Sequence, residues 1–271
     1  KVGAKNFYYA FLTLPKAKRQ AIYAAYAFCR ITDDISDDLV GEERETGLAD
    51  LHKALDSAYS NRPEGAVFIA LGDAANQFHI PKSYFEDVIK GVEMDLTRNR
   101  YDTFEELREY CYHVASVVGL ICVEVFGYSD DRAVASAIDL GIAMQLTNIM
   151  RDVGEDAERG RIYLPLEDLR RFGYTEELLL AGVWNENFHA LMKFEAERTR
   201  EYFARGTHLF NLLDRRSRAC PQTLASVYAR ILSKMEHEKF PVFEKRVGIS
   251  KFTKLAMVVR LWIMSRIPRP I

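Results

Sequence analysis

Two acidic segments, about 120 residues apart, each place carboxylates four positions from one another. The first segment contains Asp33 and Asp37, and the second contains Asp152 and Asp156. At about 100° per residue, side chains four positions apart lie on the same face of a helix, one turn from each other. The spacing therefore predicts two helices that each present a pair of carboxylates on one side.

Each acidic pair continues toward the N-terminus as a polar row on an otherwise apolar helix. Tyr26 and Arg30 precede the first pair, and Gln145 and Asn148 precede the second. Such a row costs stability unless its members have partners, so a solvated helix end explains one acidic run better than two matched rows. Mg²⁺ in proteins is usually held by one or two carboxylates together with substrate phosphates and waters. We interpret the rows as a metal site that clamps a diphosphate.

Helical periodicity extends along the whole chain, without sustained polar and apolar alternation. The expected fold class is all-α, in a single domain over residues 1–271. Pro15 suits the first turn of a helix that runs toward Asp38, and Thr103 with Glu106 forms a capping box for a helix through Tyr110. Helix breaks are expected near residues 61–65, 97–101, 128–131, 160–165 and 247–250.

The composition of the chain limits which partners and cofactors it can be expected to bind. The 271 residues are 48% hydrophobic and carry a net charge of -2, which gives no basis for nucleic-acid binding by general electrostatics. The four cysteines are widely spaced and form no CxxC pair, so we expect reduced core thiols in a cytoplasmic protein and no structural zinc site. No GxGxxG or P-loop pattern occurs, which leaves a Rossmann-type nicotinamide site unsupported.

Two apolar segments bear on membrane contact. The stretch from Val114 to Phe126 is shorter than the roughly 20 residues of a membrane helix, and we expect a central buried helix there instead of a transmembrane segment. The C-terminal segment 252–266 is apolar but interrupted by Lys254, Arg260 and Arg266. This pattern is typical of an amphipathic helix that lies on a surface, so peripheral membrane association is left open.

Several short motifs are spread over almost the whole chain: FYYAF at 7–11, YAFCR at 26–30, GVEMDL at 91–96, YCYHVA at 110–115, QLTNIMRDVGED at 145–156 and RIYLP at 161–165. Together they resemble the squalene/phytoene synthase superfamily, whose members join two allylic isoprenyl diphosphates head to head. The similarity is most specific in the block from 145 to 165.

The resemblance implies a class I isoprenoid synthase bundle with a central active-site cavity. It implies Mg²⁺, or Mn²⁺ in its place, held by Asp33, Asp37, Asn148, Asp152 and Asp156. It further implies that diphosphate oxygens or metal-bound water contact Arg30, Gln145, Asn148, Arg151 and Tyr110. Tyr228 and Arg246 match residues that close the diphosphate end, although Lys245 competes with Arg246 for that role.

A prenyl carbocation needs apolar and aromatic walls that exclude water and face it with ring systems. Beside Tyr26, the candidates for substrate-binding walls are Phe7, Phe11, Tyr23, Val114, Ala115 and Gly119, with ordinary core packing as the alternative for each. Bulky Phe11 and Tyr23 favour a C15 donor, farnesyl diphosphate, over C20 geranylgeranyl diphosphate, because a longer chain needs volume that packed rings deny. The segment 159–174 is expected to fold over the second acidic row.

The implied reaction has two ionisations and passes through a cyclopropylcarbinyl diphosphate. We expect a C30 squalene-type product or release of presqualene diphosphate, with phytoene synthesis from C20 units as the alternative. Use of NADPH stays open because the motifs are common to every way of quenching the final cation. A class I terpene cyclase, a chain-elongating prenyltransferase and a helical interaction domain with acidic patches are the competing interpretations.

Overall fold

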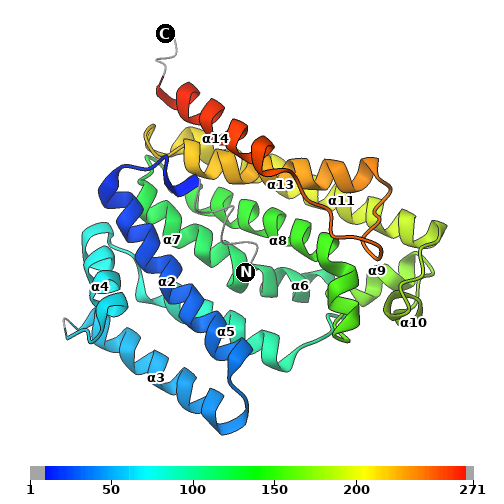
Figure 1. Cartoon of the computed structure of the whole chain (residues 1–271), viewed down its shortest axis with the longest axis horizontal. Coiled ribbons are helices and arrows are strands. Elements are labelled where there is room, and N and C mark those ends of the chain that lie inside the picture. Colours follow the sequence, from blue (N-terminus) through cyan, green and yellow to red (C-terminus); the bar gives the residue numbers. More distant parts are fainter. Residues whose placement is uncertain (1–9, 61, 267–271) are drawn as a thin grey trace.

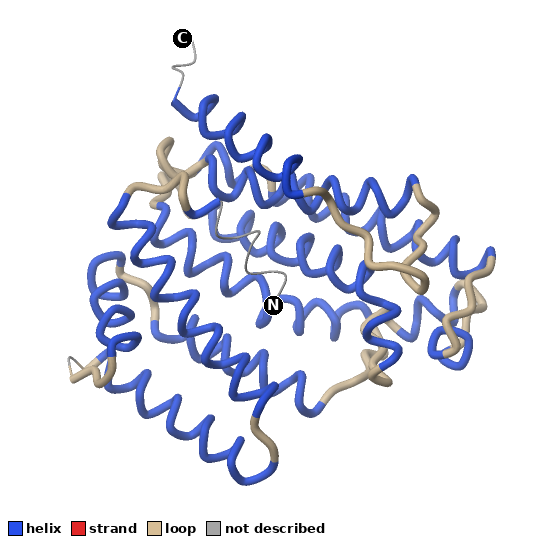
Figure 2. The backbone as a smooth tube through the Cα atoms, in the orientation of Figure 1, coloured by secondary structure: helices blue, strands red, loops and turns tan. Residues whose placement is uncertain are grey.

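The computed structural model describes residues 10–60 and 62–266. Within these ranges all regular structure is helical, apart from an isolated antiparallel bridge between Tyr128 and Leu213 (Figure 2). The all-α prediction is therefore confirmed. In chain order the helices are α2 (Lys16–Asp38), α3 (Gly41–Tyr59), α4 (Ala66–Phe78), α5 (Lys82–Thr97), α6 (Phe104–Cys111), the π-helical turn η1 (Tyr112–Ser116), α7 (Val117–Phe126), α8 (Arg132–Glu158), α9 (Leu166–Arg171), α10 (Glu176–Leu180), α11 (Glu186–Gly206), α12 (Leu209–Leu212), α13 (Ala219–His237) and α14 (Lys251–Arg266).

Helix ends follow the local signals in the sequence. Helix α2 begins directly after Pro15, and each predicted break falls between two helices. At the start of α6 the Glu106 amide donates to the Thr103 hydroxyl, while the Glu106 carboxylate accepts from the Asp102 amide at 2.9 Å. The capping box is thus present, with the return bond displaced by one residue.

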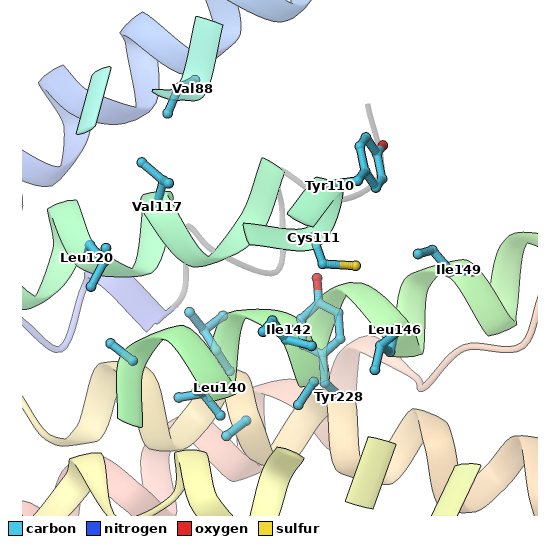
Figure 3. Packing of buried hydrophobic residues seen from close by; sticks show 14 of the residues in the cluster. Val88, Tyr110, Cys111, Val117, Leu120, Leu140, Ile142, Leu146, Ile149 and Tyr228 are labelled. Atoms are coloured by element: carbon cyan, nitrogen blue, oxygen red, sulfur yellow. The ribbon is translucent and has the colours of Figure 1, made fainter. Parts of the chain in front are cut away.

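Helix α8 lies in the middle of the bundle. It packs against α7 and η1 on one side and against α11 and α13 on another, while α2 to α5 form the opposite part of the molecule (Figure 1). Figure 3 shows Ile142 and Leu146 of α8 beside the ring of Tyr228 from α13. One core cluster includes residues from Ala10 to Val247. The single-domain organisation stays a prediction, which this shared core favours.

The buried helix expected at 114–126 proves to be the later part of a longer helical stretch with a π turn, η1, in it. Two glycines let η1 fit between α5 and α8. A Cβ atom at Gly141 would lie 2.5 Å from the Ser116 Cα, and one at Gly91 would lie 3.0 Å from the His113 carbonyl carbon. The Ser116 hydroxyl also donates to the Ile138 carbonyl at 2.8 Å. Such π turns occur frequently at functional sites.

Two stretches, Phe104–Phe126 and Arg132–Glu158, are long and apolar enough to cross a membrane by length and composition alone. In each of them 56% of the apolar window is buried inside the molecule, as in a core helix.

All four cysteines are free, and burial raises the pKa of the Cys29 and Cys122 thiols to about 12. These thiols therefore stay protonated at neutral pH.

A buried ionic cluster joins α9 to α11. The Arg198 guanidinium donates to Asp168 at 2.7 Å and to Glu195 at 3.0 Å, and it lies 4.0 Å from the ring centroid of Phe104. Burial, together with the nearby Asp168 carboxylate, raises the pKa of Glu195 to about 8 although Arg198 opposes the shift. One guanidinium faces two carboxyl groups, so one of them, Glu195, tends to keep its proton.

This raised pKa predicts a pH-dependent effect of Glu195→Gln on stability. The folded chain binds the Glu195 proton more tightly than the unfolded chain, whose value is 4.5, so this stabilisation is complete below that pH and is lost as pH rises through about 8. We expect the Tm of Glu195→Gln, relative to wild type, to rise with pH across that window. Glu197→Gln, at an exposed site on the same helix, is the control. A constant difference between Glu195→Gln and wild type would contradict this prediction.

Candidate active site

The polar row on α8 is partly buried on the face that the sequence predicts. Asn148 donates from its amide nitrogen to the Gln145 side-chain oxygen at 3.2 Å, and Asp152 and Asp156 follow at one-turn intervals. Ile149 and Val153, which lie between these positions, point instead into the core. The row is therefore one face of a helix whose other faces are fixed by packing.

Two guanidinium groups hold the Asp152 carboxylate. Arg151 donates to its two oxygens at 2.8 and 2.6 Å, and Arg246 donates to the same two oxygens at 2.9 Å each. Bidentate pairs of this kind are strong and fix the orientation of the carboxylate. Lys245 pairs with Glu238 at 2.9 Å instead. The structure thus brings Arg246, and not Lys245, to the second acidic row.

A close approach between α8 and the segment after α13 explains how Arg246 reaches this row. A Cβ atom at Gly154 would lie 2.5 Å from the Val242 carbonyl oxygen. Glycine is therefore the residue that lets the backbone of this segment cross the helix two residues from both Asp152 and Asp156.

Asp156 lies in a setting that disfavours a second negative charge. Burial is the largest cause and the neighbouring Asp152 carboxylate the next, and together they raise the pKa of Asp156 to about 7. A divalent cation would relieve this repulsion, and carboxylate and amide oxygens are the ligands that Mg²⁺ prefers. The donor set on α8 therefore fits the expected metal.

The row on α2 is more exposed. Arg30 contacts Asp34 at 2.5 Å and Asp33 at 3.7 Å, and about half of the Asp33 side chain is accessible. Asp37 lies in the last turn of α2, but its side chain is outside the described part of the structure. In Figure 1 the acidic C-terminal ends of α2 and α8 both point toward the lower right. Among the described side chains, no three His, Cys, Asp or Glu residues gather closely enough to hold one metal ion.

Phe11 contacts two other aromatic side chains expected at the wall, Tyr23 and Tyr26 of α2. The ring centroid of Phe11 lies 6.1 Å from that of Tyr23 and 6.4 Å from that of Tyr26, both edge to face. Val114 and Ala115 lie in η1 and are half-buried. Gly119 lies on α7, where a Cβ atom would make an ordinary contact with α8 at 3.5 Å. Phe7 falls outside the described residues.

Tyr110 belongs to a buried aromatic stack that no sequence pattern predicted. Its ring centroid is 5.3 Å from those of Tyr101 and Tyr163, and the Tyr163 hydroxyl donates to Asp95 at 2.8 Å. Burial is the main cause that holds the pKa of Tyr110 well above its usual value, and Asp95 adds to it. The phenol is therefore neutral and can donate one hydrogen bond. Asp95 and Tyr163 are not among the predicted site residues, although both contact this stack and lie in segments that carry the family resemblance.

Tyr228 is buried against the second acidic row. Burial raises the pKa of its hydroxyl, which is hydrogen-bonded to Asn148 and lies near Arg151. A neutral phenol in this position orients the Asn148 amide. Tyr228 thus reaches the row from α13, and its role at the diphosphate end stays a prediction.

The segment after α8 begins beside Asp156, at the end of the second acidic row. Arg161, Tyr163 and Asp156 line a cavity of about 10 Å³, enough for roughly one water molecule. A larger cavity of about 500 Å³ lies elsewhere, at the start of α2, beside Lys18 and Asp214. A central cavity that holds prenyl chains stays a prediction.

The family model described as squalene/phytoene synthase matches residues 1–253. The chain belongs to the squalene/phytoene synthase family. A 15-cis-phytoene synthase of Synechocystis sp. is 40% identical over 97% of this chain and 82% of the relative. A phytoene synthase of Mycobacterium bovis is 36% identical over 94% of this chain and 85% of the relative.

Solved structures of two related enzymes share the fold. The structure of a dehydrosqualene synthase with a bound ligand covers 96% of this chain and 91% of its own, with a TM-score of 0.87 at 32% identity. The squalene synthase of Alicyclobacillus acidocaldarius covers 87% of this chain and 89% of its own, with a TM-score of 0.83 at 28% identity. The resemblance inferred from the motifs is thereby confirmed.

Membership of this family fixes the reaction class. The chain is a prenyltransferase-type enzyme for head-to-head condensation of isoprenyl diphosphates, and the family uses divalent metal ions. The terpene cyclase, chain-elongating and non-enzymatic interpretations are set aside on this ground. Binding of the diphosphates by the two polar rows and their arginines stays a prediction.

Proposed function

We propose that this enzyme condenses two molecules of farnesyl diphosphate through a cyclopropylcarbinyl diphosphate, and releases either a C30 squalene-type product or presqualene diphosphate. The observation that carries the choice of a C15 substrate is the contact of Phe11 with Tyr23 and Tyr26. Three packed rings beside α2 occupy volume that the additional isoprene units of a C20 chain would need. The reaction would take place in the cytoplasm.

The two polar rows would bind and orient the diphosphates. Mg²⁺, or Mn²⁺ in its place, held by Asp33, Asp37, Asn148, Asp152 and Asp156, would neutralise the charge that develops on a departing diphosphate. Arg30, Arg151 and Arg246 would add charge-assisted hydrogen bonds to the same oxygens, and neutral Tyr110 would donate one more. The contacts of Arg151 and Arg246 with Asp152 support the assignment of both arginines to this site.

The apolar side chains would keep water away from the carbocation. Phe11 and Tyr23, with Val114 and Ala115 of η1, would form walls from which water is excluded. Ring faces stabilise a nearby positive charge by roughly 0.5 to 2 kcal/mol each. These walls would extend the lifetime of the cation until the second bond forms.

Phytoene synthesis from two geranylgeranyl diphosphates is the second candidate. The observation that favours it is the 40% identity with a protein named 15-cis-phytoene synthase. Measuring kcat/KM for each diphosphate with purified protein and Mg²⁺ tests the two proposals. A higher value with farnesyl diphosphate is expected, whereas a higher value with geranylgeranyl diphosphate would replace the first proposal with the second.

The role of Phe11 leads to a selectivity prediction. Phe11→Ala removes a buried ring, and we expect the ratio of kcat/KM for geranylgeranyl over farnesyl diphosphate to rise by about tenfold. Leu12→Ala changes the neighbouring, exposed side chain and is the matched control. If Phe11→Ala remains folded and leaves the ratio at its wild-type value, Phe11 does not limit chain length.

A further inference from the structure

Two consecutive residues after α13 take the left-handed backbone conformation. Lys239 has a φ of 57° and Phe240 has a φ of 54°. A helix commonly ends with one such residue, usually glycine, because a residue with a Cβ atom is strained there. The Phe240 amide closes the end of α13 by donating to the Met235 carbonyl at 2.6 Å. A second strained residue has to be held by contacts outside α13.

Trp184 holds this turn from the segment between α10 and α11. Its indole nitrogen donates to the Lys239 carbonyl at 3.0 Å, although 42% of the residue is exposed. The Phe240 side chain is fully buried, and its ring centroid lies 5.9 Å from that of His189. The His189 centroid in turn lies 5.9 Å from the nearest ring centroid of Trp184. These contacts stabilise a conformation that the backbone alone disfavours.

The turn determines the path of the segment that carries Arg246. Residues 239–250, which we call the strap, connect α13 to α14 beside the C-terminal end of α8 (Figure 1). The strap crosses α8 at Gly154, where the Val242 carbonyl oxygen leaves no room for a Cβ atom. Four residues later, Arg246 donates to both oxygens of Asp152. A shift of the turn would therefore move the crossing point, and the guanidinium with it.

We propose that Trp184 is a positioning residue for Arg246, because it holds the strained turn that sets the path of the strap. The inference rests on the proposed contact of Arg246 with a diphosphate, since only then does a shift of the strap change the reaction. The competing explanation is that the turn merely caps α13. Capping accounts for the conformation of Lys239 but not for that of Phe240, whose φ is also positive.

Kinetics of Trp184→Phe in two backgrounds test the proposal. The change keeps an aromatic ring and removes the indole N–H, and we expect it to lower kcat/KM for the preferred allylic diphosphate by about three- to tenfold, as for loss of one hydrogen bond. In Arg246→Ala the same change should cost less than about twofold, because the positioned group is gone. Trp262→Phe changes the other tryptophan of the chain and should leave kcat/KM unchanged. Given a loss in Arg246→Ala itself, wild-type kcat/KM in folded Trp184→Phe, or an equal loss in both backgrounds, would overturn the proposal.

Relief of the backbone strain tests how the positioning works. Glycine takes the left-handed conformation without a Cβ penalty, so Trp184→Phe/Lys239→Gly should recover kcat/KM to within about twofold of wild type. Trp184→Phe/Lys239→Ala also removes the lysine side chain but keeps the Cβ atom, and it should stay as impaired as Trp184→Phe. Recovery by both double variants, or by neither, would overturn the proposal.

Arg246→Ala alone separates a failure of this inference from a failure of the proposed function. If that variant retains wild-type kcat/KM, Arg246 does not act on the diphosphate, and the proposed function loses this residue. Urea unfolding then still decides the positioning role. The changes in unfolding free energy of Trp184→Phe and Arg246→Ala should be non-additive in the double variant, whereas residues that do not interact usually give additive changes. Additive changes would overturn the inference.

Discussion

Asp152→Asn should lower kcat/KM for the allylic diphosphate by about 10²- to 10³-fold, because on the proposed mechanism this carboxylate holds the metal ion and arginines that stabilise the departing diphosphate. Both oxygens of Asp152 are held by Arg151 and by Arg246, and the carboxylate lies one turn from Asp156. An amide of the same shape keeps the packing but cannot neutralise either the arginines or a metal ion. Steady-state rates of diphosphate release would measure the loss.

Two controls make this result specific. Asp50→Asn removes an exposed carboxylate on α3 that pairs with Lys53, and it should leave activity unchanged. Inorganic diphosphate with Mg²⁺ should raise the Tm of wild type, since a ligand bound only to the folded state stabilises it, and should raise that of Asp152→Asn much less. Removal of an essential charge should cost far more than about twofold in activity. If Asp152→Asn is folded and its activity is within about twofold of wild type, the acidic row on α8 is not the diphosphate site.

Gly141→Ala should destabilise the protein by about 2 kcal/mol or more through overpacking. The new Cβ atom would lie 2.5 Å from the Ser116 Cα and 2.8 Å from the Ser116 nitrogen. Both are backbone atoms of η1, so no side-chain rotation relieves the clash. The gain in helix propensity from glycine to alanine, up to about 1 kcal/mol, is smaller than this cost.

Gly119→Ala is the matched variant for Gly141→Ala. Gly119 lies on α7, and its added Cβ atom would make an ordinary contact with the Ala137 carbonyl at 3.5 Å. We expect urea unfolding to give Gly119→Ala a free energy within about 1 kcal/mol of wild type. An unfolding free energy of Gly141→Ala equal to that of wild type would show that η1 can move away from α8 without cost.

Local spacing was sufficient to predict the helices and the polar row on α8. Gln145, Asn148, Asp152 and Asp156 share a face because they recur about once per turn, and helical geometry alone dictates that arrangement. The capping box at Thr103 was readable for the same reason. Helices, shared helix faces and helix caps depend on residues close together in sequence, so a local sequence pattern can predict them.

Features set by contacts between distant segments were not predictable in this way. Whether Lys245 or Arg246 reaches Asp152 depends on the path of the chain over Gly154, a contact between segments far apart in sequence. The stack of Tyr101, Tyr110 and Tyr163 likewise joins separate segments. The π turn η1 has no local signal in the sequence, and its close contacts are with Gly91 of α5 and Gly141 of α8.

Product analysis tests the central claim most directly. Purified protein would be incubated with farnesyl diphosphate and Mg²⁺, with and without NADPH, beside a geranylgeranyl diphosphate control, and the extracts would be dephosphorylated and examined by gas chromatography and mass spectrometry. We predict a C30 skeleton from farnesyl diphosphate alone, either as a hydrocarbon or as the alcohol derived from presqualene diphosphate. Cyclic C15 products, or products that require isopentenyl diphosphate, would contradict head-to-head condensation.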